Sequence, residues 1–171
     1  NSTGASVLYC DAGDLIINGT VFNNNLAKGK YVTGGVIRII GGAMVIDNCT
    51  FTKNKITGTD YGIGGVIGSL SGGVSILNSK FNSNIVNGTN TAGAAAIYIE
   101  TAVLEINNSE IKSNKVISKE AYGGAIYGFL NVASDKKRLN VKKCNFTANK
   151  ASKSGRDVLG GTCSNCIYNY I

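Results

Sequence analysis

Short runs of alternating apolar and polar residues fill the chain, separated by turns rich in Gly, Asn and Ser. Each run has four to six residues of the types that favour strands. The clearest alternation keeps two positions apolar, while the residue between them varies from Ile to Ser, Glu or Asn. The apolar columns are Leu15, Met44, Val74, Leu104, Leu139 and Ile17, Ile46, Ile76, Ile106, Val141, on either side of Ile16, Val45, Ser75, Glu105, Asn140. Apolar residues at every second position predict strands with one buried face.

One motif occurs five times: an apolar residue, then Phe or Ile at the fifth position after it, then Asn at the eighth. Successive copies start 29, 30, 30 and 35 residues apart. The copies are Ile17, Phe22, Asn25; Ile46, Phe51, Asn54; Ile76, Phe81, Asn84; Ile106, Ile111, Asn114; and Val141, Phe146, Asn149. The longer last interval predicts a loop inserted at residues 131–138. Because a unit this short cannot bury its apolar face alone, the units must stack on one another.

A second motif keeps the same period as the first. Its close copies are Gly34–Ile37, Gly64–Ile67 and Gly123–Ile126, and its weaker copies are Ala94–Ile97 and Ala5–Leu8. We expect the glycine pairs to make a tight bend before the first strand of each turn.

The two motifs in one phase predict an all-β fold, a right-handed parallel β-helix that forms a single domain over residues 1–171. We expect three short strands per turn, and about five full turns followed by a partial sixth. Stacking creates an internal apolar column, a ladder of amides at a bend, and a left-handed turn position. In this order, the columns are Phe22, Phe51, Phe81, Ile111, Phe146; Asn25, Asn54, Asn84, Asn114, Asn149; and Gly19, Asn48, Asn78, Asn108, Lys143.

The amino-acid composition excludes several kinds of catalytic and metal-binding site. The 171 residues include 23 Gly but no His, Pro or Trp. The lack of His excludes catalysis and metal binding through imidazole, and we expect no cofactor. No apolar run approaches the length of about 18 residues that predicts a membrane-spanning helix. Lys and Arg exceed Asp and Glu by 17 to 10, but the basic residues are scattered and match no recognition motif, so we expect no nucleic-acid partner.

The cysteines fall into two groups. Cys10, Cys49 and Cys144 belong to inward columns, where a free thiol serves as a small apolar residue. Cys163 and Cys166 are the only close pair, and we expect a local disulfide that holds the C-terminal turn, with two reduced thiols as the alternative. A zinc site would need four ligands, and the other cysteines lie in distant columns.

Parallel β-helices also occur in polysaccharide lyases and glycosidases, which need clustered or paired carboxylates. The acidic residues of this chain form no such group. Glu100, Glu105 and Glu110 share one turn, but they lie on three strands that face different directions. Asp11 and Glu100 share a column three turns apart, roughly 14 Å at the usual strand spacing. We therefore expect a non-catalytic protein.

The outward column of the first strand is the candidate binding surface. Tyr and Arg are favoured where proteins contact other proteins, and aromatic rings also stack on sugars. The column and its flanks are rich in these types and in apolar residues, and we expect a ligand to bind at Tyr9, Arg38, Tyr98, Tyr127 and Phe129. The alternative is that another segment of the protein covers this face.

The paired GGA(I/V) and FxxN motifs resemble the polymorphic outer-membrane protein repeats of chlamydiae. They resemble equally the repeats of adhesin-like surface proteins of methanogenic archaea, in which units such as NCTFTKN (Asn48–Asn54) and CNFTANKA (Cys144–Ala151) are typical. The resemblance covers roughly residues 5–159 and departs from the motifs at Ala94–Ala96 and Ile111. It implies a fragment of a larger protein that flanks it at both ends, is exposed on the cell surface or secreted, and acts in adhesion.

Together these observations predict an adhesion module that contacts another cell, a glycan or a surface protein, and that does not itself span a membrane. Two alternatives remain open. One is a polysaccharide-active enzyme of the lyase type. The other is a passive spacer that holds a distal domain away from the cell envelope.

Overall fold

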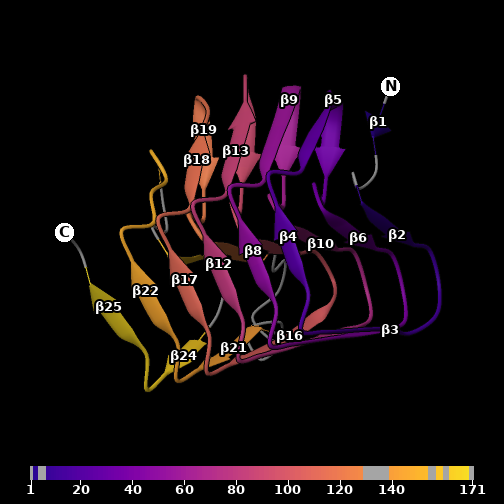
Figure 1. Ribbon diagram of the computed structural model, residues 1–171. Helices are drawn as coiled ribbons and strands as arrows, with labels where there is room; N and C mark the ends of the chain where they lie inside the picture. Colours follow the sequence, from indigo (N-terminus) through magenta and orange to yellow (C-terminus); the bar gives the residue numbers. More distant parts are fainter. Residues whose placement is uncertain (1, 4–6, 129–138, 154–156, 160–161, 170–171) are drawn as a thin grey trace.

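The computed structural model describes residues 2–3, 7–128, 139–153, 157–159 and 162–169. All regular structure in this part of the chain is β-strand, and strands of successive turns pair in parallel. The turns stack along one axis, with β2 and β25 near opposite ends of the stack (Figure 1). The predicted parallel β-helix is therefore confirmed. The loop predicted at residues 131–138 lies outside the described residues.

The first two sheets each contain six strands. The first sheet consists of β2 (Leu8–Cys10), β6 (Ile37–Ile39), β10 (Ile67–Ser69), β15 (Ile97–Ile99), β20 (Ile126–Gly128) and β23 (Val158–Leu159). The second sheet consists of β3 (Leu15–Asn18), β7 (Ala43–Asp47), β11 (Gly73–Leu77), β16 (Val103–Asn107), β21 (Leu139–Lys142) and β24 (Thr162–Ser164). In the first sheet, the strands from β2 to β20 begin at the last residue of each copy of the second motif, so the glycine pairs lie in the bend before the strand, as predicted. In the second sheet, the strands from β3 to β21 contain the alternating columns.

The third and fourth sheets complete each turn. The third sheet consists of β4 (Val21–Asn23), β8 (Thr50–Thr52), β12 (Lys80–Asn82), β17 (Glu110–Lys112), β22 (Asn145–Thr147) and β25 (Ile167–Asn169). The fourth sheet consists of β1 (Ser2–Thr3), β5 (Leu26–Thr33), β9 (Lys55–Ile63), β13 (Ile85–Gly88), β14 (Thr91–Gly93), β18 (Lys115–Ile117) and β19 (Glu120–Tyr122).

The number of strands per turn and the number of turns differ from the prediction. Each complete turn crosses four sheets rather than three, and in the described part of the chain four turns, which begin at β2, β6, β10 and β15, carry strands in all four. The fourth sheet has its own small apolar core, formed by Ala27, Val32, Ile56, Val86, Ala92, Ala95, Val116 and Ala121. Ala27, Ile56, Val86 and Val116 recur two residues after each amide of the ladder, so this apolar column was present in the sequence and could have indicated the sheet. The later residues of each segment vary in type and spacing and resembled a variable loop.

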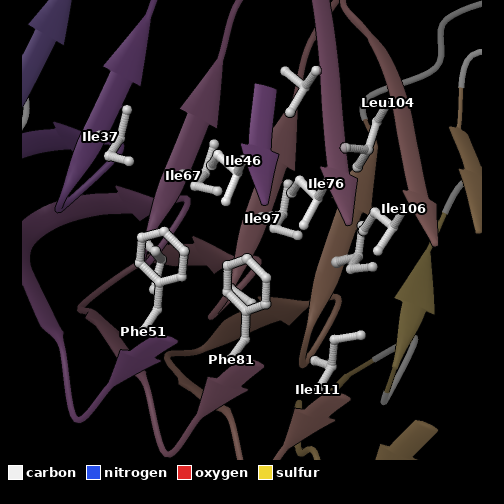
Figure 2. Close-up of a cluster of buried hydrophobic side chains, with 14 of the residues drawn as sticks. Ile37, Ile46, Phe51, Ile67, Ile76, Phe81, Ile97, Leu104, Ile106 and Ile111 are labelled. Carbon is white, nitrogen blue, oxygen red and sulfur yellow. The ribbon is translucent and has the colours of Figure 1, made fainter. Parts of the chain in front are cut away.

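The main core lies between the first three sheets and follows the predicted columns (Figure 2). Phe51 and Phe81 are fully buried, and the rings of Phe22, Phe51 and Phe81 stack with centroid distances of 4.8 Å. The free thiols of Cys49 and Cys144 are also buried, as expected for an inward column. The column that contains Phe51 and Phe81 is therefore internal in each of its turns, with a ring in four of them and Ile111 in place of the ring in the other.

The predicted amide ladder runs along the bend between the third and fourth sheets. Asn84 is fully buried and accepts hydrogen bonds from the backbone N–H and the Nδ2 atom of Asn54, both at 3.0 Å. Its own Nδ2 atom donates to the Phe51 carbonyl at 3.1 Å and to Oδ1 of Asn114 at 2.9 Å. The last amide, Asn149, donates to Oδ1 of Asp157 at 2.8 Å. The ladder thus satisfies buried polar groups that would otherwise cost free energy.

Two of the columns with a left-handed backbone conformation lie just before and just after the strands of the third sheet. The predicted one is confirmed, with φ between 49° and 60° at Gly19, Asn48, Asn78, Asn108 and Lys143. The other directly precedes the ladder, with φ between 53° and 56° at Asn24, Lys53, Ser83, Ser113 and Ala148. Its varied residue types carry no signal of this conformation, which is why the sequence did not reveal it.

Candidate functional site

The outward column of the first sheet has the predicted register, but it is not continuous. Strand pairing places Tyr9, Arg38, Gly68, Tyr98 and Tyr127 on successive turns. At Gly68 the backbone of Gly34 lies so close that a Cβ atom would be 2.7 Å from its nitrogen. The bend of one turn therefore crosses the outer face of the next, and it divides the column into two groups.

The expectation that Tyr98 is exposed is wrong. Its side chain is only 6% exposed and packs against Ile63, Ala94, Tyr61 and Tyr127. The bend at Gly64 lies directly over it, since a Cβ atom built there would be 3.1 Å from the Tyr98 Cβ atom. The sequence pattern gave the side of the strand correctly, but it could not show that the preceding bend folds back over that side.

One flank of the column also differs from the prediction. The alternation places the flank Val7, Val36, Val66, Ala96 and Ala125 on the outer face. Val7 is exposed, but the other four residues are buried in the main core. The outer face is therefore narrower and less apolar than the sequence indicated.

Four tyrosines meet where the fourth sheet adjoins the first, and we call Tyr61, Tyr98, Tyr122 and Tyr127 the tyrosine cluster. The ring centroid of Tyr127 lies 5.8 Å from that of Tyr98 and 5.9 Å from that of Tyr122. Tyr61, Tyr122 and Tyr127 are half-buried, so each keeps part of its ring at the surface. Rings at such distances interact favourably beyond the area that they bury.

Tyr61 and Tyr122 were missed as site residues because they lie in the segments that resembled variable loops. Tyr61 belongs to β9 and Tyr122 to β19, both in the fourth sheet. Gly93 was one residue that could have indicated close packing in this region, because it lies beside a tyrosine of the next turn. A Cβ atom at Gly93 would be 2.8 Å from Cδ1 of Tyr127, so the missing side chain leaves room for the ring.

Burial and neighbouring groups raise the pKa of three phenols in the cluster, those of Tyr61, Tyr98 and Tyr127. Burial raises the pKa of Tyr98 far above its ordinary value, and the nearby Glu100 carboxylate raises it further. The pKa values of Tyr61 and Tyr127 are also raised, first by burial and then by neighbouring tyrosines. The hydroxyl groups of Tyr61 and Tyr127 therefore stay neutral to a higher pH than an ordinary phenol, and a neutral phenol can both donate and accept a hydrogen bond.

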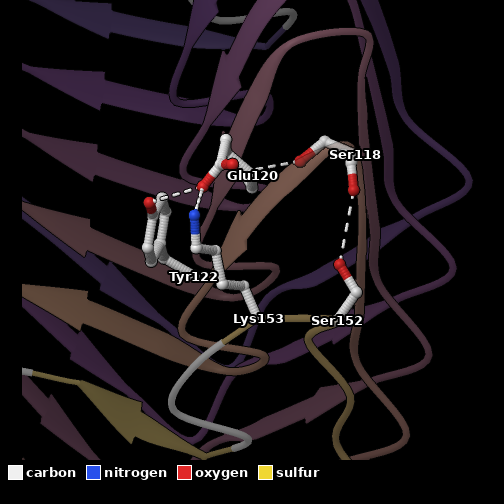
Figure 3. Close-up of polar contacts among 5 residues, drawn as sticks. All are labelled: Ser118, Glu120, Tyr122, Ser152 and Lys153. Atoms are coloured by element: carbon white, nitrogen blue, oxygen red, sulfur yellow. Dashed lines mark hydrogen bonds and ion pairs between the residues drawn. The ribbon is translucent and has the colours of Figure 1, made fainter.

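A polar network borders the cluster (Figure 3). Tyr122 donates from its hydroxyl to Oε2 of Glu120 at 2.9 Å, and the Lys153 ammonium contacts the same oxygen atom. These hydrogen bonds, that of Lys153 before that of Tyr122, hold the Glu120 pKa below its ordinary value. The Lys153 ammonium also lies 5.9 Å from the centre of the Tyr122 ring. The network fixes Tyr122 from one side.

Tyr9 and Arg38 form the second group, nearer the first turn. Tyr9 is exposed, and the Arg38 guanidinium carbon lies 6.0 Å from the centre of its ring. Phe129, which was predicted to extend the surface beside Tyr127, lies outside the described residues. The structure therefore brings together Tyr98 and Tyr127, pairs Tyr9 with Arg38, and separates the two groups at Gly68.

The C-terminal cysteines are only partly described. Cys166 is disulfide-bonded, but the side chain of Cys163 lies outside the described residues, so the pairing of these two cysteines stays a prediction. Among the described residues, no three Cys, Asp or Glu side chains come together as metal ligands would. No helix in this part of the chain has the length and apolarity needed to cross a membrane.

No protein-family model, no curated protein and no solved structure matches the chain.

Proposed function

We propose that the chain is a non-catalytic adhesion module of a secreted or cell-surface protein, and that the tyrosine cluster contacts another cell, a glycan or a surface protein. The supporting observation is that packing orders three half-buried rings: Tyr61 and Tyr127 pack against the buried Tyr98, and Tyr122 packs against Tyr127. Aromatic side chains that packing has already ordered offer contact area at little further entropic cost.

The structure changes the role of the individual residues in this proposal. Tyr98 is a support, because its buried ring has almost no surface to offer a partner. Tyr61, Tyr122 and Tyr127 are the contact residues, and their hydroxyl groups add hydrogen bonds to the apolar contact. Tyr9 and Arg38 lie on the first sheet, as Tyr127 does, and form a separate contact area nearer the first turn, beyond Gly68.

Attachment of purified protein to cells and to a glycan array tests the proposal. We expect the double substitution Tyr61→Ala and Tyr127→Ala to abolish attachment, because it removes two of the three half-buried rings that a partner can reach. Ile16→Ala is the control, since Ile16 is 77% exposed on the second sheet, away from the cluster. A double variant that attaches as well as the parent protein would contradict the proposal.

The attachment experiment and a separate lyase assay distinguish the adhesion module from the two alternatives. A passive spacer would attach to nothing, with or without the tyrosines. A lyase would release unsaturated products from an acidic polysaccharide in the presence of calcium, and that assay on the parent protein would replace the adhesion proposal if it were positive.

A further inference from the structure

A second surface lies at the bend between the second and third sheets, away from the tyrosine cluster. A shallow hollow of about 190 Å³ opens there across three successive turns. Its lining is entirely polar, and none of its residues is aromatic: Asn78, Ser79, Lys80, Asn108, Ser109, Glu110, Lys143 and Asn145.

The amides of the hollow are held in place by one another. Asn108 donates from Nδ2 to Oδ1 of Asn78 at 2.8 Å, and Asn78 donates in turn to Oδ1 of Asp47 at 2.9 Å. The exposed ammonium groups of Lys80 and Lys143 are different, because neither forms an ion pair with any described residue. The hollow therefore combines ordered amide groups with two lysines and one carboxylate, that of Glu110, which is the register partner of Lys80 on the next turn. Its net charge is positive.

The positive charge continues from the hollow across the third sheet. Four successive turns place exposed lysines on this side, and we call them the lysine strip: Lys53, Lys55, Lys80, Lys112, Lys115, Lys143 and Lys150. In the corresponding segments, residues 48–56, 78–86, 108–116 and 143–150, Glu110 is the only acidic residue. At the usual strand spacing the strip extends roughly 14 Å along the axis of the stack.

The fold does not need these lysines, and several of them are unfavourable for it. Lys115 pairs directly with Lys150 of the next turn, and like charges in such a position are destabilising. Lys53 and Lys143 have φ values of 54° and 50°, in the left-handed region where Asn and Gly are better tolerated. Other turns carry Asn, Ser, Ala or Gly at the positions of Lys53 and Lys143, so an anionic partner is the simplest compensation for the repeated charge.

We propose that the hollow and the lysine strip bind an acidic polysaccharide that carries carboxylate or sulfate groups. Lys80 and Lys143 pair with the anionic groups, and the amides of Asn78 and Asn108 bind sugar hydroxyls. A polysaccharide fits better than a nucleic acid, because single-stranded nucleic acids are bound through aromatic side chains that stack on the bases, and the hollow has none. This surface is distinct from the tyrosine cluster and does not depend on it.

Titration of the 171-residue chain with polygalacturonate, dextran sulfate and neutral dextran tests this inference, with a single-stranded DNA oligomer as the competing polyanion. We expect both acidic polymers to bind, or one of them if the site selects carboxylate or sulfate, and neutral dextran not to bind. The double substitution Lys80→Ala and Lys143→Ala should weaken binding roughly tenfold, from the loss of two cationic contacts. Glu110→Gln should strengthen it, because the substitution removes the one opposing charge of the hollow.

The matched control is the pair Lys28→Ala and Lys119→Ala, which removes the same charge from two exposed positions outside the strip. The inference is overturned if this control weakens binding as much as the first pair, if DNA binds as tightly as the polysaccharides, or if neither acidic polymer binds. Thermal melting of each variant shows that the fold is retained. The variant Tyr61→Ala, Tyr127→Ala should bind the acidic polymer normally, so this result and the test of adhesion are independent.

Discussion

The amide ladder lies where the strands of the fourth sheet begin, and the tyrosine cluster lies where they end. The two regions are built in opposite ways. The ladder uses the same residue in five turns, and each amide makes the same hydrogen bonds as the next. The cluster draws on different columns, and the position of Tyr98 is occupied by Tyr, Arg or Gly in the earlier turns. Repetition marks what the fold requires of every turn, whereas variation marks positions that are free to serve a particular surface.

The largest effect is expected in the most regular region, at the stack of rings. Phe81→Ala should lower the free energy of unfolding by about 3–5 kcal/mol, through lost burial and the cavity left between Phe51 and Ile111. Chemical denaturation measures this change. Lys80→Ala, at an exposed position next in sequence, should be nearly silent. If the two variants unfolded alike, the assignment of repeated columns to the core would be wrong.

The ladder should show the next largest effect. Asn84→Ala removes four hydrogen bonds and leaves the buried groups of Asn54, Asn114 and the Phe51 carbonyl without their partner. We expect a loss of roughly 1–3 kcal/mol in denaturation experiments. Asn23→Ala, at an exposed position on β4, is the control, and an equal loss there would contradict a special role for the ladder.

In the tyrosine cluster, Tyr98→Ala should have a smaller effect on stability. The ring is buried, but its neighbours Tyr61 and Tyr127 are half-exposed and can move into the space that it leaves. We expect a loss of about 1–2 kcal/mol, below that of Phe81→Ala because of this relaxation. A loss equal to that at Phe81 would show that the cluster is as structural as the core, and the contrast between the two regions would fail.

Alkaline pH offers a test of the cluster that does not remove a ring. A pKa that is raised in the folded protein contributes stability that is fully present below the pKa of the unfolded chain, about 10 for tyrosine, and is lost as the pH rises above it. The protein should therefore lose stability between about pH 9 and 11 more steeply than the variant Tyr98→Phe, whose ring cannot ionise. Parallel curves of unfolding free energy against pH would show that the ring of Tyr98 is not buried.

The smallest effect is expected at Glu120. Its lowered pKa means that its contribution is present above the ordinary carboxyl pKa and is lost as the pH falls through the folded value. Because the ion pair with Lys153 is at the surface, Glu120→Gln should lower the melting temperature by only about 1–2 °C near neutral pH. The difference from the parent protein should vanish in acid, and a difference that persists there would point to another cause.

The sequence predicted the repeated features well, because columns of like residues reveal which side chains superpose. The burial of Phe81, the ladder at Asn84 and the left-handed backbone at Asn108 all follow from one alignment of the repeats. Five copies of a motif also average out the irregularity of any one turn.

The later part of the fourth sheet and the burial of Tyr98 could not be predicted in this way. The start of the sheet is an apolar column, Ala27, Ile56, Val86 and Val116, that follows the ladder by two residues and could have been found by alignment. Beyond it the segments change in length and composition, so no further column emerges. The burial of Tyr98 depends on where the bend at Gly64 lies in space, which is a tertiary contact between successive turns. Alternation within a strand tells which residues point outward, but not whether another segment covers them.

The direction of the ladder bears on how the molecule can change in length. An amide both donates and accepts hydrogen bonds, so the Nδ2 group of each Asn donates to the Oδ1 atom of the Asn in the following turn. This series of hydrogen bonds ends at Asp157, because a carboxylate accepts hydrogen bonds but donates none. A duplicated segment from Asn54 to Ser83 would find its donors and acceptors already matched at both joints. Whole turns can therefore be inserted before Asp157 without breaking the ladder, whereas an Asn placed after Asp157 would receive no hydrogen bond from it.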